Sequence, residues 1–108
     1  MGLTQDRIDE LSNELVEVFK SIYDPEIPVD IYELGLIYDA EISQEGKATV
    51  TMTLTTPNCP VAESLPMEVK ERVSEVEGIT DAEVILTFEP PWDRDMMSEE
   101  AKFDLGFL

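Results

Sequence analysis

A change of pattern from strand to helix decides the fold of this chain, and it falls on Thr55-Thr56-Pro57-Asn58-Cys59-Pro60-Val61. Apolar residues recur at every second position before this stretch and at helical spacing after it. Pro60 suits the first position of a helix, because an amide there has no partner inside the helix. Cys59 is therefore predicted at or beside the N-cap, where free backbone amides and the positive end of the helix dipole stabilise a thiolate.

The strand pattern before Cys59 predicts an antiparallel hairpin. Its second strand has two faces, an apolar one of Ala48, Val50, Met52 and Leu54 and a polar one of Thr49, Thr51, Thr53 and Thr55. Its first strand, 36–43, also alternates, with Leu36, Tyr38, Ala40 and Ile42 opposite Ile37, Asp39, Glu41 and Ser43. A turn over 44–47 joins them, with Gly46 available for a positive φ.

The helical pattern after Cys59 is interrupted by a proline. Its apolar stripe consists of Ala62, Leu65, Val69, Val73 and Val76. Because Pro66 falls inside this stripe and an interior proline costs a helix roughly 3 kcal/mol, we expect one turn from about Pro60, then a kink or restart near 64–66. Gly78 is predicted to cap the end. A third strand then spans about 82–88, with Ala82, Val84, Leu86 and Phe88 toward the core.

The chain begins with an amphipathic helix over 4–23, whose apolar stripe is Ile8, Leu11, Leu15, Val18, Phe19 and Ile22. Pro25 ends this helix. Two prolines then stiffen the segment Asp24-Pro25-Glu26-Ile27-Pro28, which can present Asp24 and Glu26 from a rigid connector. Solvent-facing carboxylates are the more ordinary reading of such a segment. The next residues, 29–35, read as a short turn closed by Gly35.

The C-terminal tail starts with Glu89-Pro90-Pro91-Trp92, which cannot continue a central strand. A short helix is predicted from about 98 to 105, ended by Gly106. The tail is rich in large apolar residues, namely Trp92, Met96, Met97, Phe103, Leu105, Phe107 and Leu108. We favour their covering one end of the core; the alternative is a partner or dimer surface that includes Trp92, Met97 and Phe103.

These elements predict a single α/β domain, of the α+β two-layer kind, over residues 1–108. Its order is αββαβ plus a short C-terminal helix, with both main helices on one face of a three-stranded sheet. Since a crossover connection in a sheet is right-handed, the second and third strands should run parallel. The pattern does not say whether the second and third strands are neighbours in the sheet.

The chain is strongly acidic, with 25 Asp and Glu against 7 Lys and Arg and a formal charge of −18. Such a surface repels phosphate backbones and anionic lipid, so we expect no nucleic-acid or membrane role. A solvated acidic coat explains the charge, and so does steering toward a basic protein partner. The single cysteine and the absence of a long apolar run or a signal-peptide pattern lead us to expect a cytoplasmic protein.

Residue types exclude several kinds of chemistry. Without histidine, Cys–His catalysis and histidine metal sites are not available. Zinc-ligand spacing and a glycine-rich phosphate loop are also missing. The candidate functional residues that remain are Asp24, Glu26, Thr55, Thr56 and Cys59. On these grounds alone, a lone cysteine is more often a small buried apolar residue than a reactive one.

Four stretches together resemble one family. They are Asp24-Pro25-Glu26, Val29 to Tyr38, Thr55 to Pro60, and Pro90-Pro91-Trp92 with Met97-Ser98. They look like the metal–sulfur cluster assembly proteins of the SufT type, whose relatives include the PaaD accessory protein of phenylacetate degradation and a subunit of the eukaryotic cytosolic iron–sulfur targeting complex. The resemblance spans about 6–106 and implies a compact α/β domain whose functional site matches Asp24, Glu26, Thr55, Thr56 and Cys59.

The resemblance also implies a function: assembly or delivery of iron–sulfur clusters to client proteins, without enzymatic turnover and with Cys59 as the reactive or ligating thiol. One chain would bind no cofactor tightly, since a cluster generally takes four protein ligands; Cys59 would hold iron or a cluster transiently. Expected partners are other assembly proteins, client apoproteins and, in one arrangement, a second copy of the chain. The competing hypothesis is an adaptor that docks clients through its acidic face and tail, with Cys59 merely packed.

Overall fold

The computed structural model describes residues 2–24, 27–55 and 59–106, and for 59–63 the backbone alone. Its elements in chain order are α1 (Gln5–Lys20), β1 (Ile37–Ile42), β2 (Lys47–Met52), α2 (Cys59–Ser74), β3 (Asp81–Leu86), a 3-10 turn η1 (Arg94–Met96) and α3 (Glu99–Asp104). The order αββαβ with a short C-terminal helix is therefore confirmed. None of the described helices combines the length and the apolar character that a bilayer span requires.

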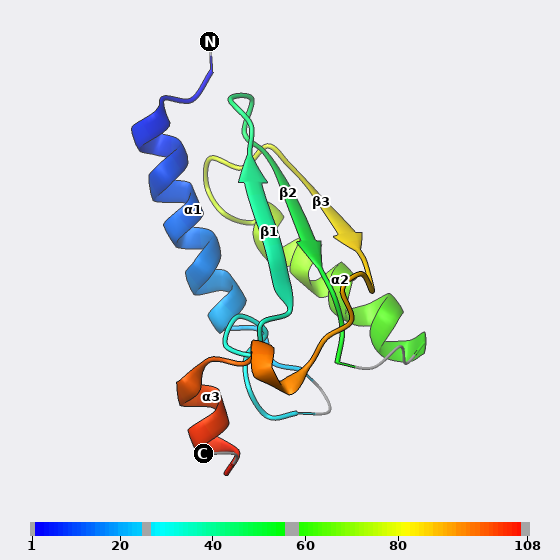
Figure 1. The fold of residues 1–108 in the computed structure, drawn as a ribbon. Helices are drawn as coiled ribbons and strands as arrows, with labels where there is room; N and C mark the ends of the chain where they lie inside the picture. The colour runs from blue at the N-terminus through cyan, green and yellow to red at the C-terminus, as the bar shows by residue number, and fades with distance from the viewer. Residues whose placement is uncertain (1, 25–26, 56–58, 107–108) are drawn as a thin grey trace.

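The sheet has the strand order β1-β2-β3 (Figure 1). β1 and β2 pair antiparallel, and the turn between them contains Gly46 at φ +88. β2 and β3 pair parallel, as predicted, and the structure makes them neighbours. The amide of Thr80 donates to the carbonyl of Gly46 at 2.9 Å, so the hairpin turn also anchors the start of β3.

α1 and α2 pack against each other and against one face of the sheet, which gives the predicted two layers (Figure 1). The hydroxyl of Thr4 caps α1 by accepting from the amide of Arg7 at 3.2 Å. Most of the described apolar positions of both helical stripes are buried with the inner face of β2, and the shared core includes Leu11, Leu15, Phe19, Val50, Met52, Leu65, Val69 and Val73. Periodicity therefore predicted the core correctly where neighbouring elements are regular.

The predicted faces of the first strand are partly wrong, because β1 contains a β-bulge. Ile37 pairs with Met52 and Asp39 with Thr51, so Tyr38 is an extra residue without a partner on β2. The bulge places Ile37 against the core, together with Ile42. The Tyr38 hydroxyl donates to the carbonyl of Pro90 at 2.7 Å, which ties the tail to β1.

The ends of two strands also differ from their alternating patterns. Thr53 was expected on the polar face but is fully buried. β2 ends at Met52, and the Thr53 amide donates to the carbonyl of Leu36, the residue before β1, at 2.9 Å; Thr53 therefore lies just beyond the last paired residues, against the end of the connector. Phe88 was expected in the core but is 41% exposed, because β3 ends at Leu86.

The expected restart of the second main helix is wrong as well. α2 runs through Pro66 as one element from Cys59 to Ser74. Buried Leu65 and Val69 on either side of the proline hold both parts against the core, which offsets the lost backbone hydrogen bond. Gly78 does not cap α2; it lies at φ +103 in the later turn that leads to β3.

Candidate functional site

Most of the predicted site residues belong to one end of the sheet, where β1 begins and β2 and β3 end (Figure 1). Three segments meet there: the connector between α1 and β1, the end of β2 with the start of α2, and the tail with η1 and α3. We call this the β2-end. The topology produces it, because an antiparallel partner starts where β2 ends and the crossover helix α2 must leave from that same point.

Backbone hydrogen bonds hold the connector and the strand ends together at the β2-end. The amide of Ile31 donates to the carbonyl of Ile22 at 2.9 Å, which folds the connector back on the end of α1. The amide of Thr87 donates to the carbonyl of Met52 at 2.9 Å and prolongs the β2–β3 pairing. The end is therefore a connected backbone framework and not a set of independent loops.

Asp24 is buried within this framework, with 4% of its surface exposed. Its carboxylate Oδ1 accepts from the amide of Ile27 at 3.0 Å, and its own amide donates to the carbonyl of Val29 at 3.2 Å. The solvent-facing reading of this carboxylate is therefore wrong. A buried carboxylate in a turn, bonded to the backbone amide three residues on, shapes the connector. Glu26, its predicted companion, lies outside the described residues.

The threonines at the end of β2 have different environments. Thr55 is half-buried, and Thr56 lies outside the described residues. Thr53, which sequence reasoning missed, is fully buried, and its Oγ1 has no hydrogen-bond partner among the residues described. A buried hydroxyl without a partner costs about 1–3 kcal/mol. The available sequence signal was the run of threonines at alternate positions, which reads equally well as an exposed strand face.

Cys59 is the first residue of α2, in agreement with the predicted helix start. The structure describes only the backbone of Cys59, so the reactivity and the contacts of its thiol remain predictions. Among the described side chains, no three or more His, Cys, Asp or Glu residues come together as a metal site would require.

The tail covers the β2-end and the neighbouring core. The Trp92 indole Nε1 donates to the carbonyl of Leu34 at 2.7 Å. Met97 is buried, and Leu105 packs against the core beside it. Phe103 is 71% exposed on α3. Of the three residues predicted as a partner surface, Trp92 and Met97 thus pack inward, and Phe103 points to solvent; Phe107 and Leu108 lie outside the described residues.

The chain is similar to proteins that act in iron–sulfur maturation. A family model described as iron–sulfur cluster assembly protein matches residues 13–86. An Fe–S protein maturation auxiliary factor of Porphyromonas gingivalis is 50% identical over 95 residues, which cover 88% of this chain and 90% of that protein. The Fe–S protein maturation auxiliary factor SufT of Staphylococcus aureus is 44% identical over 85 residues, covering 79% and 97%.

A solved structure has the same fold. The crystal structure of a domain of unknown function from Bacillus anthracis superimposes with a TM-score of 0.87 at 34% identity, covering 97% of this chain and all 100% of that one. The three-stranded sheet with its helices is thus shared over nearly the whole length. The chain belongs to the iron–sulfur cluster assembly protein family, as its resemblance to the SufT type predicted.

Proposed function

We propose that this protein is an auxiliary factor in the maturation of iron–sulfur proteins, and that Cys59 is a transient ligand for iron or for a cluster in transit. Membership of the assembly family supports the general role, as do relatives named maturation auxiliary factors. The role of the thiol is our extension. In this proposal the protein delivers iron or a cluster to another protein and does not turn over a small substrate.

The observation that carries the proposal is the start of α2 at Cys59, at the same end of the sheet as buried Asp24 and half-buried Thr55. The first amides of a helix have no partners within it and favour an anion such as a thiolate. A thiolate is the form that binds iron. A connected backbone framework around that position keeps the thiolate in place while it meets another protein.

The cargo requires more ligands than one chain offers. A cluster generally takes four thiolates, so Cys59 supplies one position and the donor, the client or a second copy supplies the others. In each exchange the Cys59 sulfur–iron bond forms as a donor sulfur–iron bond breaks. No electron is transferred, and the proton released by the Cys59 thiol passes to the departing thiolate. Asp24 and Glu26 are our candidates for holding that proton or an incoming iron.

The experiment is anaerobic reconstitution with iron and sulfide, followed by transfer to an apo-ferredoxin. We expect visible absorbance in the wild type and the loss of both absorbance and cluster transfer in Cys59→Ala. The control is Thr51→Val, which changes a threonine of β2 on the outer face of the sheet and should behave like the wild type. Size-exclusion mass shows whether absorbance accompanies a dimer. Equal transfer by wild type and Cys59→Ala would remove the thiol from the mechanism.

A second candidate is the adaptor, and the exposure of Phe103 favours it. In this case Cys59→Ser leaves client maturation unchanged, whereas Phe103→Ser abolishes the binding of client or assembly proteins. Changes at Trp92 or Met97 test the adaptor less cleanly, because these side chains pack inward and their loss destabilises the fold. The two candidates therefore differ in which single substitution, Cys59→Ser or Phe103→Ser, stops maturation in the cytoplasm, where we expect the protein to act.

A further inference from the structure

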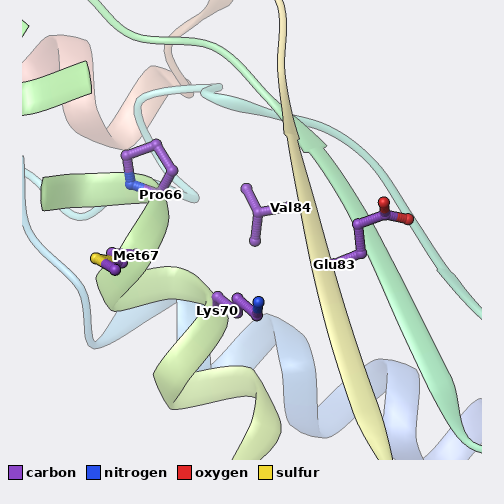
Figure 2. A pocket seen from close by; sticks show the side chains of 5 residues that line it. All are labelled: Pro66, Met67, Lys70, Glu83 and Val84. Atoms are coloured by element: carbon purple, nitrogen blue, oxygen red, sulfur yellow. The ribbon is translucent and has the colours of Figure 1, made fainter. Parts of the chain in front are cut away.

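A groove lies between α2 and the outer strand of the sheet, away from the β2-end residues (Figure 2). Its volume is about 550 Å³. Pro66, Met67 and Lys70 line it from the helix, and Val84 points into it from β3, whereas Glu83 points to the other side of the strand. The Met67 side chain is 64% exposed, so the wall of the groove is apolar and open to solvent.

β3 is an edge strand, and its edge is regular. It ends the strand order, and of the described helices and strands only β2 and α2 pack against it. All six of its residues pair with β2 without a register shift. The opposite edge differs: β1 has the bulge at Tyr38 and α1 alongside. Of the usual protections of an edge, β3 lacks the bulge, whereas α2 packs against it and its exposed Asp81 and Glu83 are charged.

Charges differ between the two sides of this edge. On the outer side, away from the helices, Asp81 and Glu83 are exposed, and Glu83 pairs with Lys47 at 3.6 Å. On the inner side the groove contains a cation, Lys70. A strand added to β3 would therefore meet Asp81, Glu83 and the exposed Ile85 with its outward side chains, and with its inward ones a groove that is apolar apart from Lys70. Opposite charges that face each other across neighbouring strands stabilise the pairing.

We infer that the β3 edge docks an extended segment of a partner protein as a fourth strand, and that this segment alternates basic with apolar residues. Its backbone pairs with the outward amides and carbonyls of β3, its apolar side chains enter the groove beside Met67 and Val84, and its lysines or arginines lie opposite Asp81 and Glu83. This surface goes beyond the proposed function, because neither Cys59 nor the β2-end takes part in it.

A second copy of the chain fits this edge poorly. Each chain carries a formal charge of −18. Pairing two β3 edges would bring Asp81 and Glu83 of one chain near the same residues of the other, and like charges across strands are destabilising. Charge complementarity therefore selects a basic partner.

The test uses the full chain, labelled with ¹⁵N, at about 0.15 M salt. The first probe is a short acetylated peptide in which lysine and valine alternate. The second peptide has the same composition, arranged as a block of lysines followed by a block of valines. Its charge is equal, but as a strand it would not have one basic face and one apolar face. We expect the alternating peptide to bind about tenfold more tightly. Its shift changes should centre on 66–70 and 81–86, and amides of β3 should gain protection from hydrogen exchange.

Two matched variants separate groove binding from general attraction. Met67→Lys and Tyr23→Lys each replace an exposed large hydrophobic side chain by lysine, the first in the groove and the second in the connector after α1. Met67→Lys should weaken the alternating peptide about tenfold, and Tyr23→Lys less than about twofold. Equal binding of both peptides, equal effects of both variants, shifts spread over the acidic surface, or no binding at all would each overturn the inference.

Discussion

The Trp92 indole donates a hydrogen bond of 2.7 Å to the carbonyl oxygen of Leu34, across 58 residues of chain. This bond joins the tail to the connector that contains Asp24. Next to it, the amide of Ser98 donates to the carbonyl of Glu33 at 2.8 Å. The tail is thereby part of the candidate site's framework, although it follows the last strand.

Trp92→Phe keeps a large ring and removes this hydrogen bond. Because the Leu34 carbonyl then loses its donor in a partly buried place, we expect the free energy of unfolding to fall by about 1 kcal/mol. Urea denaturation followed by circular dichroism measures the change. The control is Phe103→Leu on exposed α3, which should stay within about 0.5 kcal/mol of the wild type. Equal stability of Trp92→Phe and wild type would show that the bond contributes nothing.

Gly35 and Gly106 form a matched pair, with φ angles of +80 and +81. A Cβ on Gly106 would meet no atom of the described residues within 4 Å, whereas a Cβ on Gly35 would collide with the backbone carbonyl of Met96. Gly106→Ala should therefore cost only the left-handed strain, about 1 kcal/mol. Gly35→Ala should cost at least about 3 kcal/mol, because the connector and η1 must also separate.

Chemical denaturation of both glycine variants gives the comparison directly. The difference between the two losses measures the close approach of the connector to η1, since the backbone strain is common to both. If the two variants lost the same stability, the tight packing of Gly35 against Met96 would be contradicted.

Thr53→Val should raise stability. Valine has the shape of threonine without the hydroxyl, and the Thr53 Oγ1 is buried without a partner among the described residues. Removing it should increase the free energy of unfolding by about 1 kcal/mol. Thr51→Val, on the outer face of the same strand, should change stability by less than about 0.5 kcal/mol. If Thr53→Val lost stability while Thr51→Val did not, the Thr53 hydroxyl would have a hydrogen-bond partner in solution, and the prediction would be wrong.

Added salt should stabilise the protein. With a formal charge of −18, the folded chain repels itself, and salt at about 0.15 M shortens the Debye length to about 8 Å. The melting temperature should rise from low salt to this concentration, as scanning calorimetry would record. In the variant Glu14→Gln/Glu17→Gln, which removes two exposed charges from α1, the rise should be smaller. A melting temperature independent of salt in both proteins would argue against self-repulsion.

Local pattern predicted most of the elements. The Pro60 signal placed the helix start within one residue of its position at Cys59, and the alternation of Ala48, Val50 and Met52 identified the buried face of β2. These features depend on a few neighbouring residues, on helix capping and on the two-residue period of a strand. The failures at Ile37 and Thr53 lie where pairing with another strand begins or ends.

The residues of the candidate site were chosen from the family pattern, and their membership stays a prediction; their position and burial in the fold could not be predicted from sequence. The family pattern selected Asp24 and Thr55, yet the burial of Asp24 follows from the connector folding back onto α1 through Ile31 and Ile22. No local signal carries that information, because the two backbone groups meet only after the helix and sheet have packed. Glu26, Thr56 and the side chain of Cys59 remain predictions.

The sequence by itself determined the order of elements, the helix start at Cys59, the acidic surface and the family. Tertiary structure alone decided that β3 lies beside β2 with no described strand on its other edge, that Tyr38 forms a bulge, and that Trp92 donates a hydrogen bond to Leu34. The reason is physical: capping and periodicity act over one or two turns of chain. Strand neighbours, bulges and buried hydrogen bonds between distant residues depend on which surfaces pack together.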